Sequence, residues 1–278
     1  MRTIAMTVNG EELKADLARP SDLSIALEFG GAQPSYFGAP AARAAAVKVE
    51  GFVGDTREGG SCNCSEYHLI PHCNGTHTEC VGHVTDDRVS VRDALRPGLH
   101  IALLMSVKPE SVEMSTERTT PEPKPGDHLV TARSLETVLG RWPERKAEVW
   151  VIRTQPNYSD KARRRYRADN PPPYFSREAV ELAVARGIEH LVTDLPSLDR
   201  SYDEGRLTGH RTFWGLPAGS REAKAATRPH ATITELAFVP TAVKDGWYLI
   251  DLQIAPFASD AAPSRPVLYP IVTGARPS

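Results

Sequence analysis

The sequence predicts a mixed α/β fold, and three observations support this fold class. Segments typical of strands outnumber those typical of helices along the chain. A segment beyond the middle reads strand, helix, strand, which is the pattern of a β-α-β unit. The chain has 278 residues, of which 40% are apolar and 24% are charged, as in an ordinary globular protein with a substantial core. We therefore expect one domain over residues 1–278, with strands in residues 1–44 as an N-terminal extension.

The strands are predicted by short apolar or alternating stretches bounded by turn residues. At the N-terminus, TIAMTV is followed by the pair Asn9-Gly10, which is typical of a hairpin. Two proline-rich and charged stretches, residues 115–128 and 164–175, are expected to be irregular. The further stretches expected to form strands are 45–55 (with a break at a glycine), 100–107, 147–155, 188–194, 231–240 and 246–257.

One helix is well marked in the sequence. Ser176 is a suitable N-cap before REAVELAVAR, and Gly187 stands where a helix end is expected. The stretch IEHLVTD follows directly and is expected to form a strand that ends at Asp194. Together with the strand at 147–155, this helix completes the β-α-β unit. Functional side chains are then expected on loops and strand ends.

Charge and hydropathy exclude several classes of partner. The formal net charge is −2, so the chain lacks the general basic field of a nucleic-acid-binding protein. No apolar run approaches the roughly eighteen residues of a membrane span, and MRTIAMTVNGEELK becomes polar too early for a secretory signal. We therefore expect a cytoplasmic protein with a small-molecule substrate, and neither nucleic acid nor membrane as a partner.

Residues 71–83, PHCNGTHTECVGH, concentrate metal-ligating and acid–base side chains. His77 and Glu79 are separated by one residue, so in an extended segment their side chains point to the same side. An imidazole and a carboxylate placed together suit a divalent metal ion. His83 follows four positions later, close enough to share the site and free to act as a base. An ordinary polar loop is the alternative interpretation.

Other residues could complete this site. Glu235 is the only charge on the apolar face of the strand expected at 231–240, and a buried carboxylate is usually paired or bound to metal. His210, in GRLTGHRTFWG, is a further candidate. His72 and Cys73 precede a turn, and either could reach the same ion. A simple salt bridge remains the alternative for Glu235.

The four cysteines offer a different chemistry. Their spacing, C-x-C and then gaps of eight and six residues, is not the paired C-x-x-C of a structural zinc module. Disulfides are disfavoured in the cytoplasm, so most of these thiols are expected to fill space in the core. Cys80 lies beside Glu79 and close to His83, which leaves a nucleophilic role for its thiol as a third hypothesis.

The chain resembles the cyclase superfamily in three blocks. NGTHTECVGH is similar to the signature H-x-G-T-H-x-D-x-x-x-H, and HLVTDLPSLDRSYDEGRLTGHR is similar to a block in which D-x-P-S-x-D precedes a histidine. ITELAFV resembles a third block, a strand with a glutamate, and the resemblance spans about residues 45–257. The relatives are metal-dependent hydrolases that include bacterial kynurenine formamidase (arylformamidase). They imply a swivelling β/β/α fold and a homo-oligomer, dimer or tetramer.

The resemblance implies a role for each candidate residue. His77 would be a metal ligand, Glu79 the bridging acidic ligand, and His83 the general acid–base group. His210 and Glu235 would be ligands of the second metal position. The implied cofactor is zinc, with manganese as the alternative, bound as one or two ions.

The sequence also departs from the family pattern. The first ligand histidine of the family falls on Cys73, so either a thiolate replaces it or a bulge at Asn74 delivers His72. A thiolate ligand would favour zinc over harder ions. Glu79 stands where the family has aspartate, and Val81 where it usually has proline. These differences argue against a close identity with kynurenine formamidase.

We therefore expect a metal-dependent hydrolase that is arylformamidase-like in attacking a C–N bond. The substrate bond would be an amide, a formamide, or a cyclic amide or ester, attacked by water that the metal activates. His83 would move the proton. The alternative is a non-catalytic protein that binds a small ligand or a metal on the same scaffold, as the changes at Cys73 and Glu79 suggest.

Overall fold

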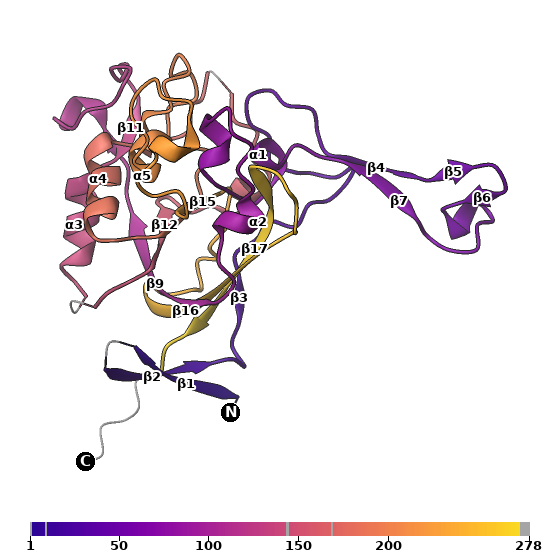
Figure 1. Ribbon diagram of the computed structural model, residues 1–278, viewed down its shortest axis with the longest axis horizontal. Helices are drawn as coiled ribbons and strands as arrows, with labels where there is room; N and C mark the ends of the chain where they lie inside the picture. The colour runs from indigo at the N-terminus through magenta and orange to yellow at the C-terminus, as the bar shows by residue number, and fades with distance from the viewer. Residues whose placement is uncertain (1, 9, 143–144, 168, 273–278) are drawn as a thin grey trace.

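The computed structural model describes residues 2–8, 10–142, 145–167 and 169–272 (Figure 1). The five α-helices are α1 (Pro71–Asn74), α2 (Val91–Ala94), α3 (Ala132–Leu139), α4 (Arg177–Ala185) and α5 (Thr208–Trp214). The strands are β1 (Thr3–Val8), β2 (Glu11–Asp16), β3 (Ser21–Asp22), β4 (Arg43–Ala46), β5 (Lys48–Val49), β6 (Phe52–Val53), β7 (Ser65–His68), β8 (His77–Glu79), β9 (Leu99–Val107), β10 (Glu110–Ser111), β11 (His128–Val130), β12 (Val149–Thr154), β13 (Tyr174–Phe175), β14 (His190–Thr193), β15 (Thr232–Glu235), β16 (Gly246–Ile254) and β17 (Ala261–Pro270). None of these helices combines the length and the hydropathy that a membrane crossing needs.

The main sheet closes on itself. Its strands follow the order β16-β9-β12-β14-β15-β8-β17, and β17 pairs again with β16, so seven strands form a ring with β3 attached outside at β17. Strands β9, β12, β14 and β15 are parallel, whereas β8, β17 and β16 are antiparallel to their neighbours. The parallel strands therefore direct their carboxyl ends to one end of the ring.

Two apolar layers hold this ring together. Alternate residues of β9 and β12, among them Leu103 and Trp150, pack with helices α3, α4 and α5 on the outer face. The residues between them, such as Leu104 and Val151, pack with β16 and β17 inside the ring. Figure 1 shows the three helices gathered on one side of the sheet. Burying each large apolar side chain contributes about 1.5–3 kcal/mol, so these layers dominate the stability of the fold.

Most of the predicted elements are confirmed. The N-terminal hairpin is β1 and β2, the strands expected at 100–107 and 147–155 are β9 and β12, and 188–194 and 246–257 contain β14 and β16. Helix α4 begins after Ser176, whose side chain accepts a hydrogen bond from the Ala179 N–H, and Gly187 follows its end with a φ of 73°. Asn9, the first residue of the expected turn, lies outside the described residues.

The glycine break expected within 45–55 lies at Gly51, whose φ of 74° folds β6 back onto β5. Two other expectations about elements were wrong in part. Strand β15 ends at Glu235 rather than at residue 240, because Leu236 adopts a left-handed φ of 52°. The irregular segment 164–175 contains the short strand β13, which pairs with β11.

Residues 43–68 form a feature that we call the arm. Figure 1 shows it reaching far from the rest of the chain as a pair of two-stranded ribbons, β4 with β7 and β5 with β6. Within the described part of the chain, neither ribbon pairs with a further strand. A two-stranded ribbon alone is only marginally stable in water, so the arm gains little from its own hydrogen bonds.

Candidate metal centre

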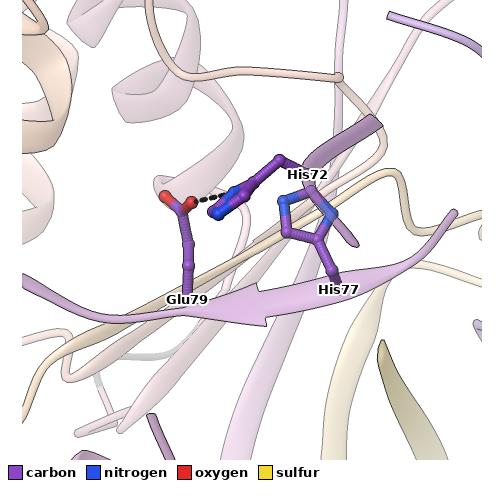
Figure 2. Close-up of side chains that lie close together, drawn as sticks. All are labelled: His72, His77 and Glu79. Carbon is purple, nitrogen blue, oxygen red and sulfur yellow. Dashed lines mark ion pairs between the residues drawn. The ribbon is translucent and has the colours of Figure 1, made fainter. Parts of the chain in front are cut away.

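Strand β8 carries two of the candidate ligands. His77 and Glu79 are two positions apart on this strand, and Figure 2 shows both side chains on the same side of it. The strand is covered on both edges, because Glu79 lies opposite Ile233 of β15 and Ala261 of β17. Both side chains are fully buried. The sheet thus holds an imidazole and a carboxylate together in a protected position.

The single turn of α1 directs His72 toward the same place. Pro71 suits the first position of a helix because it has no N–H to satisfy. Asn74 closes the turn, since its side chain accepts a hydrogen bond from the Ile70 N–H at 2.7 Å. The Nδ1 atom of His72 lies 2.9 Å from Oε2 of Glu79, a contact drawn in Figure 2.

Cys73, the next residue, lies among apolar side chains, where burial and then the nearby charge of Glu235 raise the pKa of its thiol. It is 8% exposed and packs in an apolar cluster with Tyr36, Tyr166 and Leu236. Among the described residues, the compact groups of potential ligand atoms include His72 and not Cys73. Of the two residues that the sequence offered for the first ligand, the structure therefore brings His72 to the centre.

The backbone fixes the orientation of the His77 ring. Its Nδ1 lies 3.0 Å from the carbonyl oxygen of Gly75, and a carbonyl can only accept, so Nδ1 donates there. Nε2 then faces the centre, 3.5 Å from Oε2 of Glu235. No hydrogen-bond partner among the described residues reaches this buried nitrogen. Such a tautomer, held by a backbone carbonyl, is the one that presents Nε2 to a metal ion.

Helix α5 supplies His210, which a carboxylate holds in place. Asp199 accepts hydrogen bonds from the backbone N–H groups of Gly209 and His210, at 2.6 and 3.1 Å, and from His210 Nδ1 at 2.6 Å. The opposite nitrogen, Nε2, lies 2.9 Å from Glu79 Oε1 and 3.4 Å from Glu235 Oε1. A carboxylate behind a histidine is a common support for a metal ligand.

His83 enters the site through a short 3₁₀ turn after β8. Gly82 permits this turn, because a Cβ atom there would lie 2.3 Å from the carbonyl oxygen of Val89. The Nδ1 atom of His83 is 3.4 Å from Asp260 Oδ2 and 3.9 Å from Glu79 Oε2. Its side chain is 27% exposed, whereas that of Glu79 is fully buried. This imidazole can therefore exchange a proton with solvent.

The buried polar atoms of the cluster fit a cation. Each oxygen of Glu79 lies 2.9 Å from an imidazole nitrogen, yet neither contact has the geometry of a hydrogen bond. A buried acceptor without a partner costs about 1–3 kcal/mol, and a divalent ion would satisfy these oxygens together with His77 Nε2. Three compact groups of potential ligand atoms overlap here: His72, His77 and Glu79; His72, His83 and Asp260; and Glu79, His83 and His210.

In the absence of metal, protonated imidazoles balance the carboxylates. Burial opposes the ionisation of Glu79, but the charges on His83 and His210 outweigh it and hold the pKa of that carboxyl well below its usual range. Burial also opposes protonation of His72, but its hydrogen bond with Asp260 and the close carboxylate of Glu79 prevail and raise its pKa to about 10. A divalent ion would displace such protons, so metal binding should release protons and weaken at low pH.

Two carboxylates of this cluster were missed as site residues. Asp199 belongs to the D-x-P-S-x-D segment, so the sequence carried a signal for it. Asp260 precedes β17 and lies 2.9 Å from His72 Nε2 through its Oδ2 atom. Its hydrogen bonds with His72 and His83 hold the pKa of its carboxyl well below the usual range. No local motif marks Asp260, because only the pairing of β17 with β8 brings it here.

An apolar cavity of about 530 Å³ adjoins the cluster. Pro71, which lines it, directly precedes His72, and the lining residues Ser259 and Ala261 flank Asp260. The residues around the cavity are Phe29, Tyr67, Leu69, Pro71, Phe257, Ser259 and Ala261. The cavity is thus lined by chain neighbours of His72 and Asp260, and it could take an apolar or aromatic group.

The thiol of Cys80 is unsuited to nucleophilic attack. It is fully buried and donates a hydrogen bond to the carbonyl oxygen of Val89 at 3.4 Å. Burial raises its pKa to about 12, so the reactive thiolate is not formed near neutral pH. Cys62 and Cys64 are exposed in the arm, and both are free thiols.

Comparisons with known proteins agree with this fold. The model of the Cyclase family matches residues 21–200. Among solved structures, isatin hydrolase A from Ralstonia solanacearum superposes with a TM-score of 0.59 at 13% identity, covering 90% of this chain and 91% of its own. Isatin hydrolase A from Labrenzia aggregata, solved with benzyl benzoate bound, gives 0.56 at 16% identity, with 90% and 93% covered.

A predicted metal-dependent hydrolase from Bacillus stearothermophilus gives a TM-score of 0.55 at 15% identity, covering 90% of this chain and 98% of its own. No curated protein sequence matches the chain. At such low identities the superpositions establish the fold alone, and they confirm the fold that the three sequence blocks implied.

Proposed function

Since the chain belongs to the Cyclase family, of which it is a divergent member, we propose that it is a metal-dependent hydrolase acting on an amide, a formamide, or a cyclic amide or ester. One observation carries this proposal. His77 Nε2 and both carboxylate oxygens of Glu79 are buried without a hydrogen-bond partner among the described residues, and they lie within a compact cluster of imidazoles and carboxylates. Structural ion pairs alone would not leave these atoms without hydrogen bonds.

The residues that would hold the metal come from four elements. Glu79 is central, because His72 lies beside its Oε2 atom and His210 beside its Oε1 atom. His77 and Glu235 complete the set of ligands. Imidazole and carboxylate ligands suit zinc or manganese, and one or two ions could be accommodated by five ligand residues. A divalent ion bound here lowers the pKa of water and polarises a carbonyl oxygen.

His83 is the residue that we assign to proton transfer. It is one of two partly exposed imidazoles of the cluster, with His72, and its Nδ1 lies 3.4 Å from Asp260, which can stabilise the protonated ring. Its greater distance from Glu79, 3.9 Å, sets it apart from His72 and His210 at 2.9 Å. The ring could take a proton from the attacking water and deliver it to the leaving nitrogen or oxygen.

The substrate class follows from the apolar cavity beside the cluster. Phe29, Tyr67 and Phe257 offer aromatic surface, which would bury an aryl group next to the scissile carbonyl. Two structural neighbours are isatin hydrolases, and isatin is a cyclic amide fused to an aromatic ring. An aryl formamide or a fused cyclic amide therefore fits the cavity better than a small aliphatic amide.

The proposal is tested by removing the metal. Protein treated with a strong chelator and then desalted should lose hydrolysis of isatin and of aryl formamides, and should regain it with zinc or manganese. The variant His83→Asn should retain the metal but lose about 10²–10⁴-fold in activity, the range expected for general acid–base catalysis. An exposed histidine on β11 provides the matched control, His128→Asn, which should remain active.

Two results would contradict the proposal. Activity that survives complete removal of metal would show that water is activated in another way. Retained metal without turnover on aryl formamides, cyclic amides and lactones would favour a binding protein on the same scaffold.

A further inference from the structure

We propose a second cation site at the amino ends of β9 and β14, where His100 and His190 would bind a transition-metal ion such as Zn²⁺ or Cu²⁺. This site is separate from the candidate metal centre and does not depend on the proposed hydrolase function. It rests on the arrangement of two imidazoles, their hydrogen-bond partners and the space beside them.

The two histidines lie inside the closed sheet, at the end remote from Glu235. His190 is the first residue of β14, and His100 the second of β9, with β12 between these parallel strands. His100 shares the inner face with Ala102, and His190 shares it with Val192. Glu235, in contrast, ends β15 at its carboxyl end. The two ring centroids are 4.8 Å apart and the planes are inclined by 62°.

Both rings are held through Nδ1. His100 Nδ1 lies 3.5 Å from Glu148 Oε2, and a carboxylate can only accept, so the Nδ1 of His100 carries the proton. The hydrogen bond with His100 is the largest cause of the lowered pKa of Glu148, which keeps that carboxyl ionised. His190 Nδ1 lies 2.8 Å from the hydroxyl oxygen of Thr232. Where Nδ1 donates in these contacts, Nε2 is left for an ion, which is the support that metal-binding histidines receive.

The other nitrogen of His100 lacks a partner. Its Nε2 is buried, and none of the described residues forms a hydrogen bond with it. Space is available beside it, because a Cβ atom built on Gly98 would lie 3.9 Å from Nε2 and meet no other atom within 4 Å. A cavity of about 510 Å³, lined also by Glu189 and His230, opens next to both rings. An ion bound by the rings could complete its coordination with water from this cavity.

The chemistry of the pair favours nitrogen-binding metals. Zinc–nitrogen bonds are about 2.0–2.1 Å long, which places two ligand nitrogens about 3.4 Å apart in a tetrahedral site. Ring centroids 4.8 Å apart are compatible with that spacing. Burial, reinforced by the nearby His100, lowers the pKa of His190 to about 3, so this ring is neutral and able to bind metal at pH 7. Two imidazole ligands, with no thiolate beside them, favour Cu²⁺ and Zn²⁺ over Mg²⁺ or Ca²⁺.

Metal titration tests the site without reference to activity. Full-length protein stripped of metal is titrated with Zn²⁺ in a calorimeter, and with Cu²⁺ while its electron paramagnetic resonance spectrum reports nitrogen ligands. We expect a binding class beyond that of the candidate metal centre. The variant His100→Gln should weaken this class at least 100-fold, and Glu148→Gln should weaken it about 10–100-fold, as loss of an outer partner does.

The control is His128→Gln, which removes an exposed histidine on β11 and should leave both classes unchanged. Unchanged binding in Glu148→Gln, which keeps both rings, would overturn the proposal even if His100→Gln failed to fold. The proposal is equally contradicted if the extra class disappears in His128→Gln, or if the wild-type protein shows no such class.

Discussion

At the residue scale, the one turn of α1 decides which side chain reaches the candidate metal centre. Successive helical residues point about 100° apart, so neighbouring side chains face different surroundings. His72 therefore lies 2.9 Å from Glu79, while Cys73 packs against Tyr36 and Tyr166. We therefore expect the imidazole, rather than the thiol, to bind the metal ion.

This difference predicts unequal effects of two substitutions. His72→Ala should weaken zinc binding by more than the roughly 10–100-fold that is lost when a residue supporting a ligand is removed, because it removes a ligand itself. Cys73→Ala should leave zinc affinity nearly unchanged, because its side chain fills an apolar cluster. Competition with a chromophoric chelator measures both constants. An equal or larger loss in Cys73→Ala would show that the thiolate is the ligand.

Spacing in the sequence predicted part of this centre. The alternation of a strand was enough to place His77 and Glu79 on one side. The sequence left the choice between His72 and Cys73 open. That choice depends on α1, and a helix of four residues is too short to be predicted from a periodic apolar pattern. Asp260 could not be found at all, because it is 188 residues from His72 in the chain and only strand pairing unites them.

At the element scale, a buried ion pair joins the carboxyl ends of β12 and β14. Lys161 Nζ lies 2.8 Å from Asp194 Oδ2 and donates to the Thr154 carbonyl oxygen at 2.6 Å. Asp194 also accepts hydrogen bonds from the N–H and hydroxyl groups of Thr154. The side chains of Lys161 and Asp194 are 6% and 0% exposed, so neither charge has access to bulk water.

Breaking this pair should destabilise the fold. Lys161→Met leaves the Asp194 carboxylate buried without its counter-charge, and we expect a loss of about 3–5 kcal/mol in the free energy of unfolding. Denaturant titration measures the loss. Lys224→Met is the control, since the Lys224 side chain is 82% exposed and its ion pair contributes little. Equal stabilities for the two variants would rule out a structural role for the buried pair.

Elements with strong local signals were predicted well, and those set by tertiary contacts were not. Helix α4 has a serine cap, an apolar face and a terminal glycine, so its bounds could be placed from the sequence. Strand β15 continues in the apolar pattern beyond Glu235, yet Leu236 turns away at a φ of 52°. Its backbone N–H instead donates to the carbonyl oxygen of Leu195, a contact that no local pattern encodes.

The buried His190, the first residue of β14, should make the free energy of unfolding depend on pH. Burial lowers the pKa of His190 from 6.5 to about 3, so between these values the unfolded chain binds a proton that the folded chain does not. Stability therefore falls as pH drops from about 6.5 toward 3, by on the order of 2 kcal/mol at pH 5. Above pH 6.5 this contribution is complete and constant.

The variant His190→Gln isolates this effect. Measured with chelator present, its free energy of unfolding should fall less steeply between pH 6.5 and pH 5 than that of the wild type. Parallel curves for the two proteins would mean that His190 titrates normally in the folded chain.

At the scale of the whole molecule, we expect the arm to favour self-association. Its two-stranded ribbons project from the ring of strands and carry exposed Val49 and Tyr67, which a second copy could cover (Figure 1). The homo-oligomer implied by family resemblance remains a prediction. Light scattering should give a mass of at least twice 30.4 kDa. Replacing residues 47–64 by a short turn should reduce that mass, and an unchanged oligomer would show that the arm is not the contact.

The central claim is that the cluster around Glu79 binds a divalent metal ion. Elemental analysis by mass spectrometry, on dialysed wild type and on Glu79→Gln, tests it most directly, with Glu136→Gln as an exposed control on α3. We predict one or two tightly held zinc or manganese ions per chain in the wild type and in Glu136→Gln, and less than a tenth of that amount in Glu79→Gln. A wild-type protein that retains no metal, or a Glu79→Gln variant that retains all of it, would contradict the claim.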